Sequence, residues 1–186
     1  MEISELLAEL EKHQSSSYGW ALTCCKRVEA EAEDVLQTTY LKILEGKACY
    51  RGESSFKTWL FAVIRKTAAS ERRKNTLRGL KLLGLGSHDD WAPVSRQPDV
   101  ACDVSERQRL FRRALLSLPR RQQECLHLVF YQDLSLREAA LVMGISIGAA
   151  RTHYERGKKR LRQLLDESET IHGVGWRREN NPSVIS

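Results

Sequence analysis

Residues 135–165 constrain the fold more than any other part of this chain. Ser135 and Glu138 stand three positions apart at the start of an apolar-periodic stretch. This is the spacing of a capping box, in which each side chain satisfies a backbone N–H at the start of a helix. Gly144 can adopt the left-handed conformation that ends a helix, and Ser146 can cap the next one. The pattern predicts a helix-turn-helix unit.

The second helix of this unit, expected over about 147–165, has two unlike sides. Its apolar side carries Ala150, Tyr154, Leu161, Leu164 and Leu165. Its polar side carries Arg151, Thr152, Glu155, Arg156, Lys159 and Arg162. Gly157 stands in the middle and costs ~1 kcal/mol relative to alanine, for no reason visible in the sequence. An ordinary amphipathic helix with a basic outer face is the alternative, but the capping box, the glycine turn and the basic exposed face together favour a DNA-recognition helix.

The position of each basic residue suggests how such a helix would contact DNA. A recognition helix presents its N-terminal residues to base edges in the major groove. Arg151 and Thr152 occupy those positions, and an arginine can donate two hydrogen bonds to guanine. Arg156, Lys159 and Arg160 lie further along, where phosphates are the expected partners.

The charge distribution points to the same half of the chain. The protein has 186 residues and a net charge of +6, but residues 106–165 alone hold 13 Lys and Arg against 5 Asp and Glu. A segment with this excess attracts polyanions, and nucleic acid is the usual one. A solvated basic surface is the alternative on charge alone.

Glycine, proline and aspartate set residues 76–104 apart and predict a flexible acidic linker. Both flanking regions have helical periodicity without strand alternation. The expected fold is therefore all-α, with two small helical domains over 1–75 and 105–166 and a flexible tail over 167–186. The first domain should contain a helix around Tyr18 to Leu22, an amphipathic helix ending at Gly46, and one from about Phe56 to Lys74.

Several classes of function are excluded by what the sequence lacks. The longest apolar run is far below the ~20 residues that span a bilayer, so we expect no membrane insertion. The acidic N-terminus has no signal-peptide layout, and Cys24, Cys25, Cys49, Cys102 and Cys125 form no C-x-x-C pair. We therefore expect a cytoplasmic protein with reduced thiols and no metal or other cofactor. Without a nucleophile–base set or phosphate-binding loop, we expect neither an enzyme nor a small-molecule substrate.

Two separated blocks resemble conserved regions of one protein family. The first is the run Ala32 to Tyr40, followed by Phe56 to Leu60 and Arg72-Arg73. The second is Leu118-Pro119, followed by Leu134 to Ala140, Met143 to Ser146 and Arg151 to Leu161. In this order they resemble regions two and four of extracytoplasmic-function (ECF) sigma factors, the short class of bacterial transcription initiation factors.

The resemblance implies core RNA polymerase, promoter DNA and an anti-sigma factor as partners. The polymerase large-subunit coiled coil would bind Glu33, Asp34, Gln37, Thr38 and an exposed Lys42. The polymerase flap would bind the helix around Leu126 to Phe130. The linker would thread the active-site and RNA-exit channels.

The resemblance also assigns the promoter contacts. Region two would melt and hold the −10 element through Trp59, Arg65, Lys66, Arg72, Arg73 and Lys74. Region four would read the −35 duplex through Ser146, Arg151, Thr152, His153, Glu155, Arg156, Lys159 and Arg160. Lys66, Ser70, Ala149, Ala150, His153 and Gly157 depart from the family pattern, which affects the expected base preference more than the fold.

Two other functions fit part of the sequence. A stand-alone helix-turn-helix regulator would bind duplex DNA as a dimer without polymerase, but dimeric regulators need a fixed half-site spacing that the predicted linker would not give. A helical protein-interaction adaptor leaves the basic segment and the capped helix pair unexplained.

Overall fold

The computed structural model describes residues 2–83 and 106–172 of the chain. These two ranges form helices and contain no strand, which confirms the predicted all-α class. The helices are α1 (Ile3–Lys12), α2 (Gln14–Cys24), α3 (Glu29–Leu44), α4 (Phe56–Leu83), α5 (Glu106–Leu116), α6 (Arg120–Phe130), α7 (Leu136–Met143) and α8 (Ile147–His172). Most of the predicted linker and tail, with Cys102, lies outside them.

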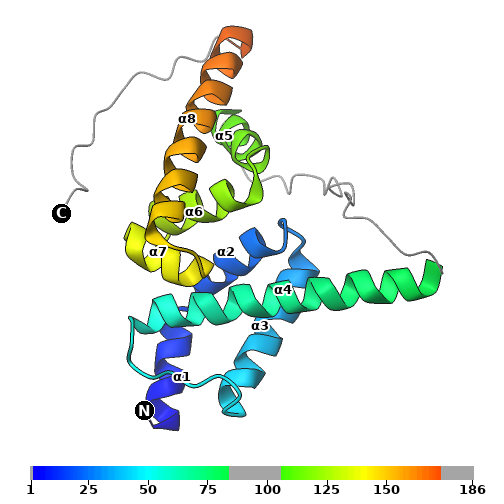
Figure 1. The fold of residues 1–186 in the computed structure, drawn as a ribbon, viewed down its shortest axis with the longest axis vertical. Helices are drawn as coiled ribbons and strands as arrows, with labels where there is room; N and C mark the ends of the chain where they lie inside the picture. Colours follow the sequence, from blue (N-terminus) through cyan, green and yellow to red (C-terminus); the bar gives the residue numbers. More distant parts are fainter. Residues whose placement is uncertain (1, 84–105, 173–186) are drawn as a thin grey trace.

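The first unit is a bundle in which α2, α3 and α4 pack on one another. Trp20 on α2 is fully buried at its centre and donates its Nε1–H to the Phe61 carbonyl of α4 at 3.0 Å. Helix α4 does not end at Lys74 as expected but continues to Leu83. A single Gly79 costs the helix only ~1 kcal/mol, which favourable neighbours such as Leu77 can offset. In Figure 1 this end of α4 projects beyond the bundle.

The second unit contains the predicted helix-turn-helix in α7 and α8. Ser135 Oγ accepts the Glu138 backbone N–H at 3.3 Å, and Glu138 Oε2 accepts the Ser135 N–H at 3.0 Å. Burial would raise the pKa of Glu138, but the hydrogen bonds from Ser135 and Thr58, together with the charge of Lys57, outweigh it and lower that pKa. Gly144 has φ 61°, and Ser146 Oγ accepts the Ala149 N–H at 3.2 Å. The capping box, the glycine turn and the second cap are all confirmed.

The structure supplies the missing reason for Gly157. A Cβ at this position would lie 3.1 Å from Gln122 Cβ and 3.2 Å from Leu126 Cδ1, so α6 crosses α8 directly over the glycine. Only a residue without a side chain lets the two helices approach this closely.

Gly157→Ala should therefore lower the free energy of unfolding by ~1 kcal/mol, because ~1–3 kcal/mol of overpacking outweighs the ~1 kcal/mol gain in helix propensity. Gly148→Ala is the matched control, since nothing lies within 4 Å of its Cβ position. Gly148→Ala should raise the free energy of unfolding by ~0.5 kcal/mol. Urea denaturation followed by far-ultraviolet circular dichroism measures both; a stabilised Gly157→Ala protein would contradict the close crossing.

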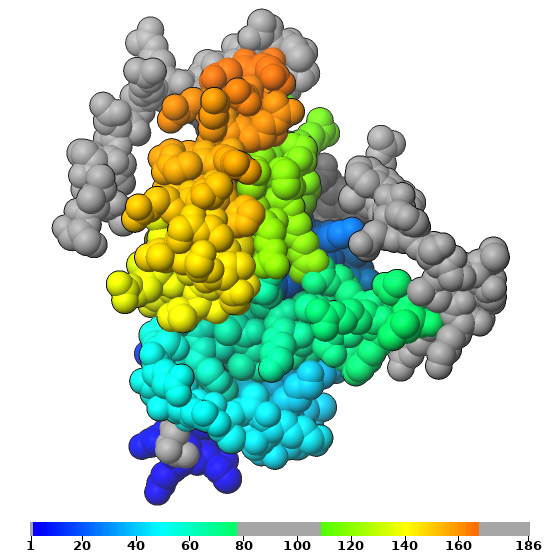
Figure 2. All heavy atoms as spheres, viewed as in Figure 1, coloured from blue at the N-terminus to red at the C-terminus, as the bar shows by residue number. Residues whose placement is uncertain are grey.

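The two units share one hydrophobic core. The cluster that contains Trp20 and Leu60 of the first unit also contains Leu128, Ala139 and Met143 of the second. Helix α4 packs against α7, and α2 packs against α6. Figure 1 shows α5–α8 lying on one side of α2 and α4, with α1 and α3 on the other, and Figure 2 shows the atoms of the two units in contact along this junction. This contact between the two units was not predicted from the sequence.

Candidate functional site

One face of α8 carries most of the residues expected to contact duplex DNA. Ser146, Arg151, Thr152, Glu155, Arg156, Lys159 and Arg160 are all exposed, and His153 is half-buried. Successive residues of an α-helix are 100° apart, so six of these side chains fall within one half of the helix circumference: Arg151, Thr152, Glu155, Arg156, Lys159 and Arg160. The opposite side holds Ala150 and Leu161, both buried in the core. The polar face is therefore free to enter a groove.

The basic residues expected at the −10 strand do not share one surface. Lys66 and Arg73 are exposed and, by helical spacing, lie on the outer side of α4. Arg65 and Arg72 are half-buried and share another side of α4 by helical spacing, and Arg65 is paired with Glu124 of the second unit. Lys74 is exposed and bonded to Glu71 at 2.8 Å. The basic run predicted from the sequence is thus divided between two faces.

The Trp59 ring is half-buried beside two other aromatic rings. Its centroid lies 5.4 Å from that of Tyr50 and 5.2 Å from that of Phe56. This packing supports the start of α4 and leaves the indole partly accessible for stacking.

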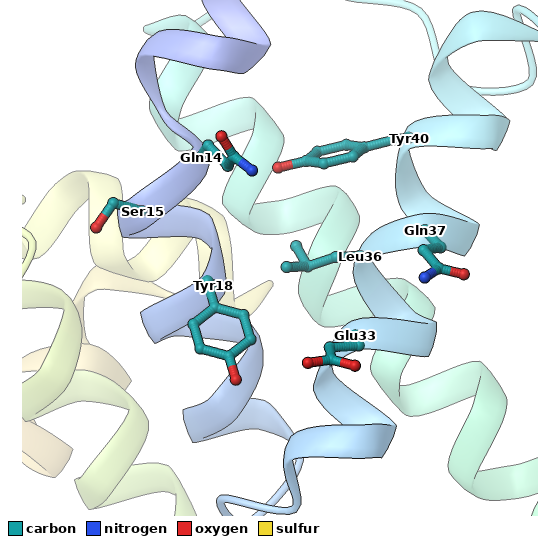
Figure 3. Close-up of a pocket in the computed structure, with 7 residues that line it drawn as sticks. All are labelled: Gln14, Ser15, Tyr18, Glu33, Leu36, Gln37 and Tyr40. Atoms are coloured by element: carbon teal, nitrogen blue, oxygen red, sulfur yellow. The ribbon is translucent and has the colours of Figure 1, made fainter.

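A groove of about 450 Å³ lies between α2 and α3, beside the residues expected to bind polymerase. Figure 3 shows Gln14 and Tyr18 of α2 across the groove from Glu33, Leu36 and Tyr40 of α3; Ser15 and Gln37 also line it, and the Ser15 side chain points away from α3. Burial raises the pKa of the Tyr40 hydroxyl, which therefore stays protonated near neutral pH. A second hollow, lined by Leu7, Leu10, Glu11, Gln14, Tyr40 and Leu44, continues the groove toward α1.

The groove has an apolar floor and an acidic, polar rim. Glu33, Asp34 and Gln37 are exposed along α3, and Thr38 is half-buried. Lys42 is not exposed as expected: it is half-buried, and its Nζ donates to Thr67 Oγ1 of α4 at 3.3 Å. Sequence analysis missed the lining residues of α2, although Tyr18 lay in a helix it predicted.

Helix α6 is less accessible than its expected flap-binding role suggested. Leu126 and Leu128 are buried, whereas Phe130 is 53% exposed at the end of the helix. The Phe130 ring stacks on Tyr154 of α8 with centroids 5.8 Å apart. A partner that binds the apolar side of this helix would therefore contact its C-terminal end.

The thiols of the described ranges are free, and three of the four are buried. Burial raises the pKa of Cys25 and of Cys125 to about 11, so both are protonated and unreactive near neutral pH. Across the same ranges, no three His, Cys, Asp or Glu side chains are grouped as a metal site would need. None of the helices described is both long enough and apolar enough to cross a membrane.

Comparison with known proteins identifies both units. Residues 10–78 match the family model of sigma-70 region 2, and residues 108–161 match that of sigma-70 region 4. The chain is 34% identical over 142 residues to the RNA polymerase sigma factor CarQ of Myxococcus xanthus, covering 75% of this chain and 78% of that protein. It is 30% identical over 160 residues to the ECF RNA polymerase sigma factor SigX of Bacillus subtilis strain 168, covering 83% and 82%.

A solved structure has the same fold. The sigma factor RpoE of Bartonella quintana, crystallised with the anti-sigma factor NepR, superposes with a TM-score of 0.67 at 24% identity, covering 88% of this chain and 98% of that one.

This chain belongs to the sigma-70 family of RNA polymerase sigma factors. Within that family it is an ECF sigma factor, which directs core RNA polymerase to promoters. The stand-alone regulator is not favoured, because region 2 is present as well as region 4.

Proposed function

We propose that the region 4 domain (105–166) reads the −35 duplex and that the region 2 domain (1–75) binds core polymerase and holds the −10 strand. The observation that carries this division is the basic face of α8, which is exposed and capped at its N-terminus by Ser146. Arg151 stands in the first turns of that helix, where a recognition helix meets base edges. Arg156, Lys159 and Arg160 follow, where phosphate contacts fix the register.

Arg151→Ala should weaken binding to a −35 duplex by ~1–3 kcal/mol and relax base preference at one position. Arg160→Ala is the control, since loss of a phosphate contact weakens all sequences alike. Binding to a library of duplexes with each −35 position varied measures both. Equal weakening of every duplex by Arg151→Ala would contradict base readout.

The groove between α2 and α3 supports the polymerase-binding role of the first domain. Its floor is apolar, its rim carries Glu33 and Gln37, and Asp34 is exposed next to Glu33 on α3; this combination suits a helical partner with basic residues around an apolar seam. Thr38 lies beside this rim, and Lys42 acts indirectly by holding α3 to α4 through Thr67.

Asp34→Arg should weaken core-polymerase binding about tenfold, ~1.4 kcal/mol, because it reverses a charge at the rim of the docking surface. Glu53→Arg makes the same charge change at an exposed position in the loop before α4. Fluorescence anisotropy with labelled protein and purified core enzyme compares the two. Unchanged affinity of Asp34→Arg, or equal loss in both variants, would refute the docking role.

The outer face of α4 supports the −10 role. Exposed Lys66, Arg73 and Lys74 offer single-stranded phosphates a basic track, and the accessible side of Trp59 offers a base a stacking surface. Arg65 and Arg72 would extend this track from the neighbouring face.

We further propose that the protein acts in the cytoplasm, without chemistry or a cofactor of its own, and that an anti-sigma factor controls it. The anti-sigma proposal is supported by the likeness in fold to RpoE of Bartonella quintana, which was crystallised with NepR. The same groove, with its exposed Leu7 and Leu44, would suit such a partner.

A further inference from the structure

A buried carboxylate joins the two domains at the junction of α4 and α6. The side chain of Glu124 has no exposed surface. Its Oε2 accepts a hydrogen bond from Arg65 Nε at 3.1 Å, and its Oε1 accepts one from Arg120 Nε at 2.8 Å. Arg120 belongs to Glu124's own helix, whereas Arg65 belongs to the other domain. The Glu124 carboxylate thus binds Arg65, a residue that we propose contacts the −10 strand.

Further polar contacts close the junction. Lys57 Nζ donates to the Gln132 carbonyl at 2.6 Å, and Thr58 Oγ1 donates to Glu138 Oε1 at 3.3 Å. Thr23 Oγ1 lies 3.1 Å from His127 Nδ1. Every one of these bonds joins region 2 to region 4, so separation of the domains breaks them together.

This closed arrangement cannot be the one that occupies a promoter. Elements named −10 and −35 lie roughly 25 base pairs apart, which is ~85 Å along B-form DNA. In the closed protein α4 packs directly on α7, the helix that precedes the recognition helix. The domains must therefore separate before each can reach its own element.

We propose that Glu124 is an intramolecular latch that keeps the free protein closed and withholds Arg65 from nucleic acid. A carboxylate offers an arginine the same negative charge and hydrogen-bond acceptors as a phosphate, so the two compete for one guanidinium group. Arg65 has 18% of its side chain exposed, so loss of its partner leaves a mostly desolvated charge and favours opening. This inference rests on the proposed −10 role in one respect only: that role identifies the DNA strand that competes with Glu124 for Arg65.

The first test measures the separation of the domains without polymerase. Spin labels at Glu53→Cys and Arg137→Cys would flank the junction, in a background where Cys49 and Cys102 are serine. Pulsed electron-spin resonance of the labelled, otherwise native protein should give a short distance for most molecules. Glu124→Gln should move most molecules to a longer, broader distribution, an increase of about tenfold in the open-to-closed ratio.

Two further variants separate opening from damage to a domain. Arg65→Gln breaks the latch from the region 2 side and leaves region 4 untouched, so it should open the protein as well. Glu45→Gln removes the same charge from an exposed pair with Lys47 and should leave the short distance unchanged. An unchanged distance in both Glu124→Gln and Arg65→Gln would overturn the latch.

The second test measures what opening releases, with a fluorescent thymidine 12-mer as the probe. Glu124→Gln should bind it about threefold more tightly than the native protein, because a larger fraction is competent to bind. Glu124→Gln combined with Arg65→Gln should lose that gain. Opening without tighter binding would overturn the competition for Arg65. Neither readout needs core enzyme, so a failure of promoter-directed transcription would leave the latch standing while refuting the proposed function.

Discussion

Trp20→Ala should lower the free energy of unfolding by ~3–5 kcal/mol, the cost typical of removing a fully buried tryptophan. The indole has no exposed surface and stacks with Phe61 and His127, with ring centroids 6.0 and 5.6 Å away. Its hydrogen bond to the Phe61 carbonyl is lost as well. The substitution therefore empties the place where α2, α4 and α6 meet.

Trp59→Ala is the matched control for this loss. The Trp59 ring is only half-buried at the edge of the bundle. Trp59→Ala should therefore lower the free energy of unfolding by about half as much as Trp20→Ala. Urea denaturation followed by circular dichroism measures both without relying on tryptophan fluorescence. Equal losses for the two substitutions would contradict the central position of Trp20.

Acidification should destabilise the closed protein through His127. Burial, and then the nearby positive charge of Arg27, lower the pKa of this imidazole from 6.5 to about 4. The group is held neutral by its surroundings: Thr23 and Gln132 bond its ring nitrogens, and Trp20 and Tyr131 stack on it. A state that exposes His127 takes up a proton as the pH falls below 6.5, whereas the closed state does so only near 4.

The sign follows from which state binds the proton first. The contribution of neutral His127 is complete above pH 6.5, falls as the pH drops toward 4, and amounts to ~2 kcal/mol lost between pH 7 and pH 5. Urea denaturation at both pH values measures this loss, and His127→Gln, which does not titrate, should lack that part of it. Identical pH dependence in the native protein and His127→Gln would contradict the assignment.

The features that the sequence predicted correctly depend on local chemistry. The capping box at Ser135, the left-handed Gly144 and the cap at Ser146 each involve residues only a few positions apart. The exposed basic face of α8 follows from helical periodicity alone. Such signals hold because their cause lies within one or two turns of helix.

The features that the sequence did not predict depend on contacts between distant elements. Lys42 is on the polar side of its helix by periodicity, yet Thr67 of another helix binds it. Gly157 is required by Gln122 and Leu126, which lie on α6. One feature of the sequence could have indicated the buried Glu124: this carboxylate lies beside the apolar stripe of α6, and Arg120 precedes it by four residues.

The candidate sites divide in the same way. The exposed polar face of α8 was predicted almost completely, because its residues share one helix. The lining of the groove between α2 and α3 was anticipated on its α3 side alone, since α2 contributes Gln14, Ser15 and Tyr18 through packing. The sequence run does not show that Arg65 and Lys66 lie on two faces of α4, because adjacent residues of a helix are 100° apart; their contact with the −10 strand stays a prediction.

Transcription from a library of genomic DNA fragments tests the central claim most directly. Purified core RNA polymerase would be supplied with this protein or with buffer, and the 5′ ends of the RNA products would be mapped. We expect new transcripts whose start sites follow a shared pair of −35 and −10 motifs, only when the protein is present. Transcripts indistinguishable from those of core enzyme alone would contradict the account.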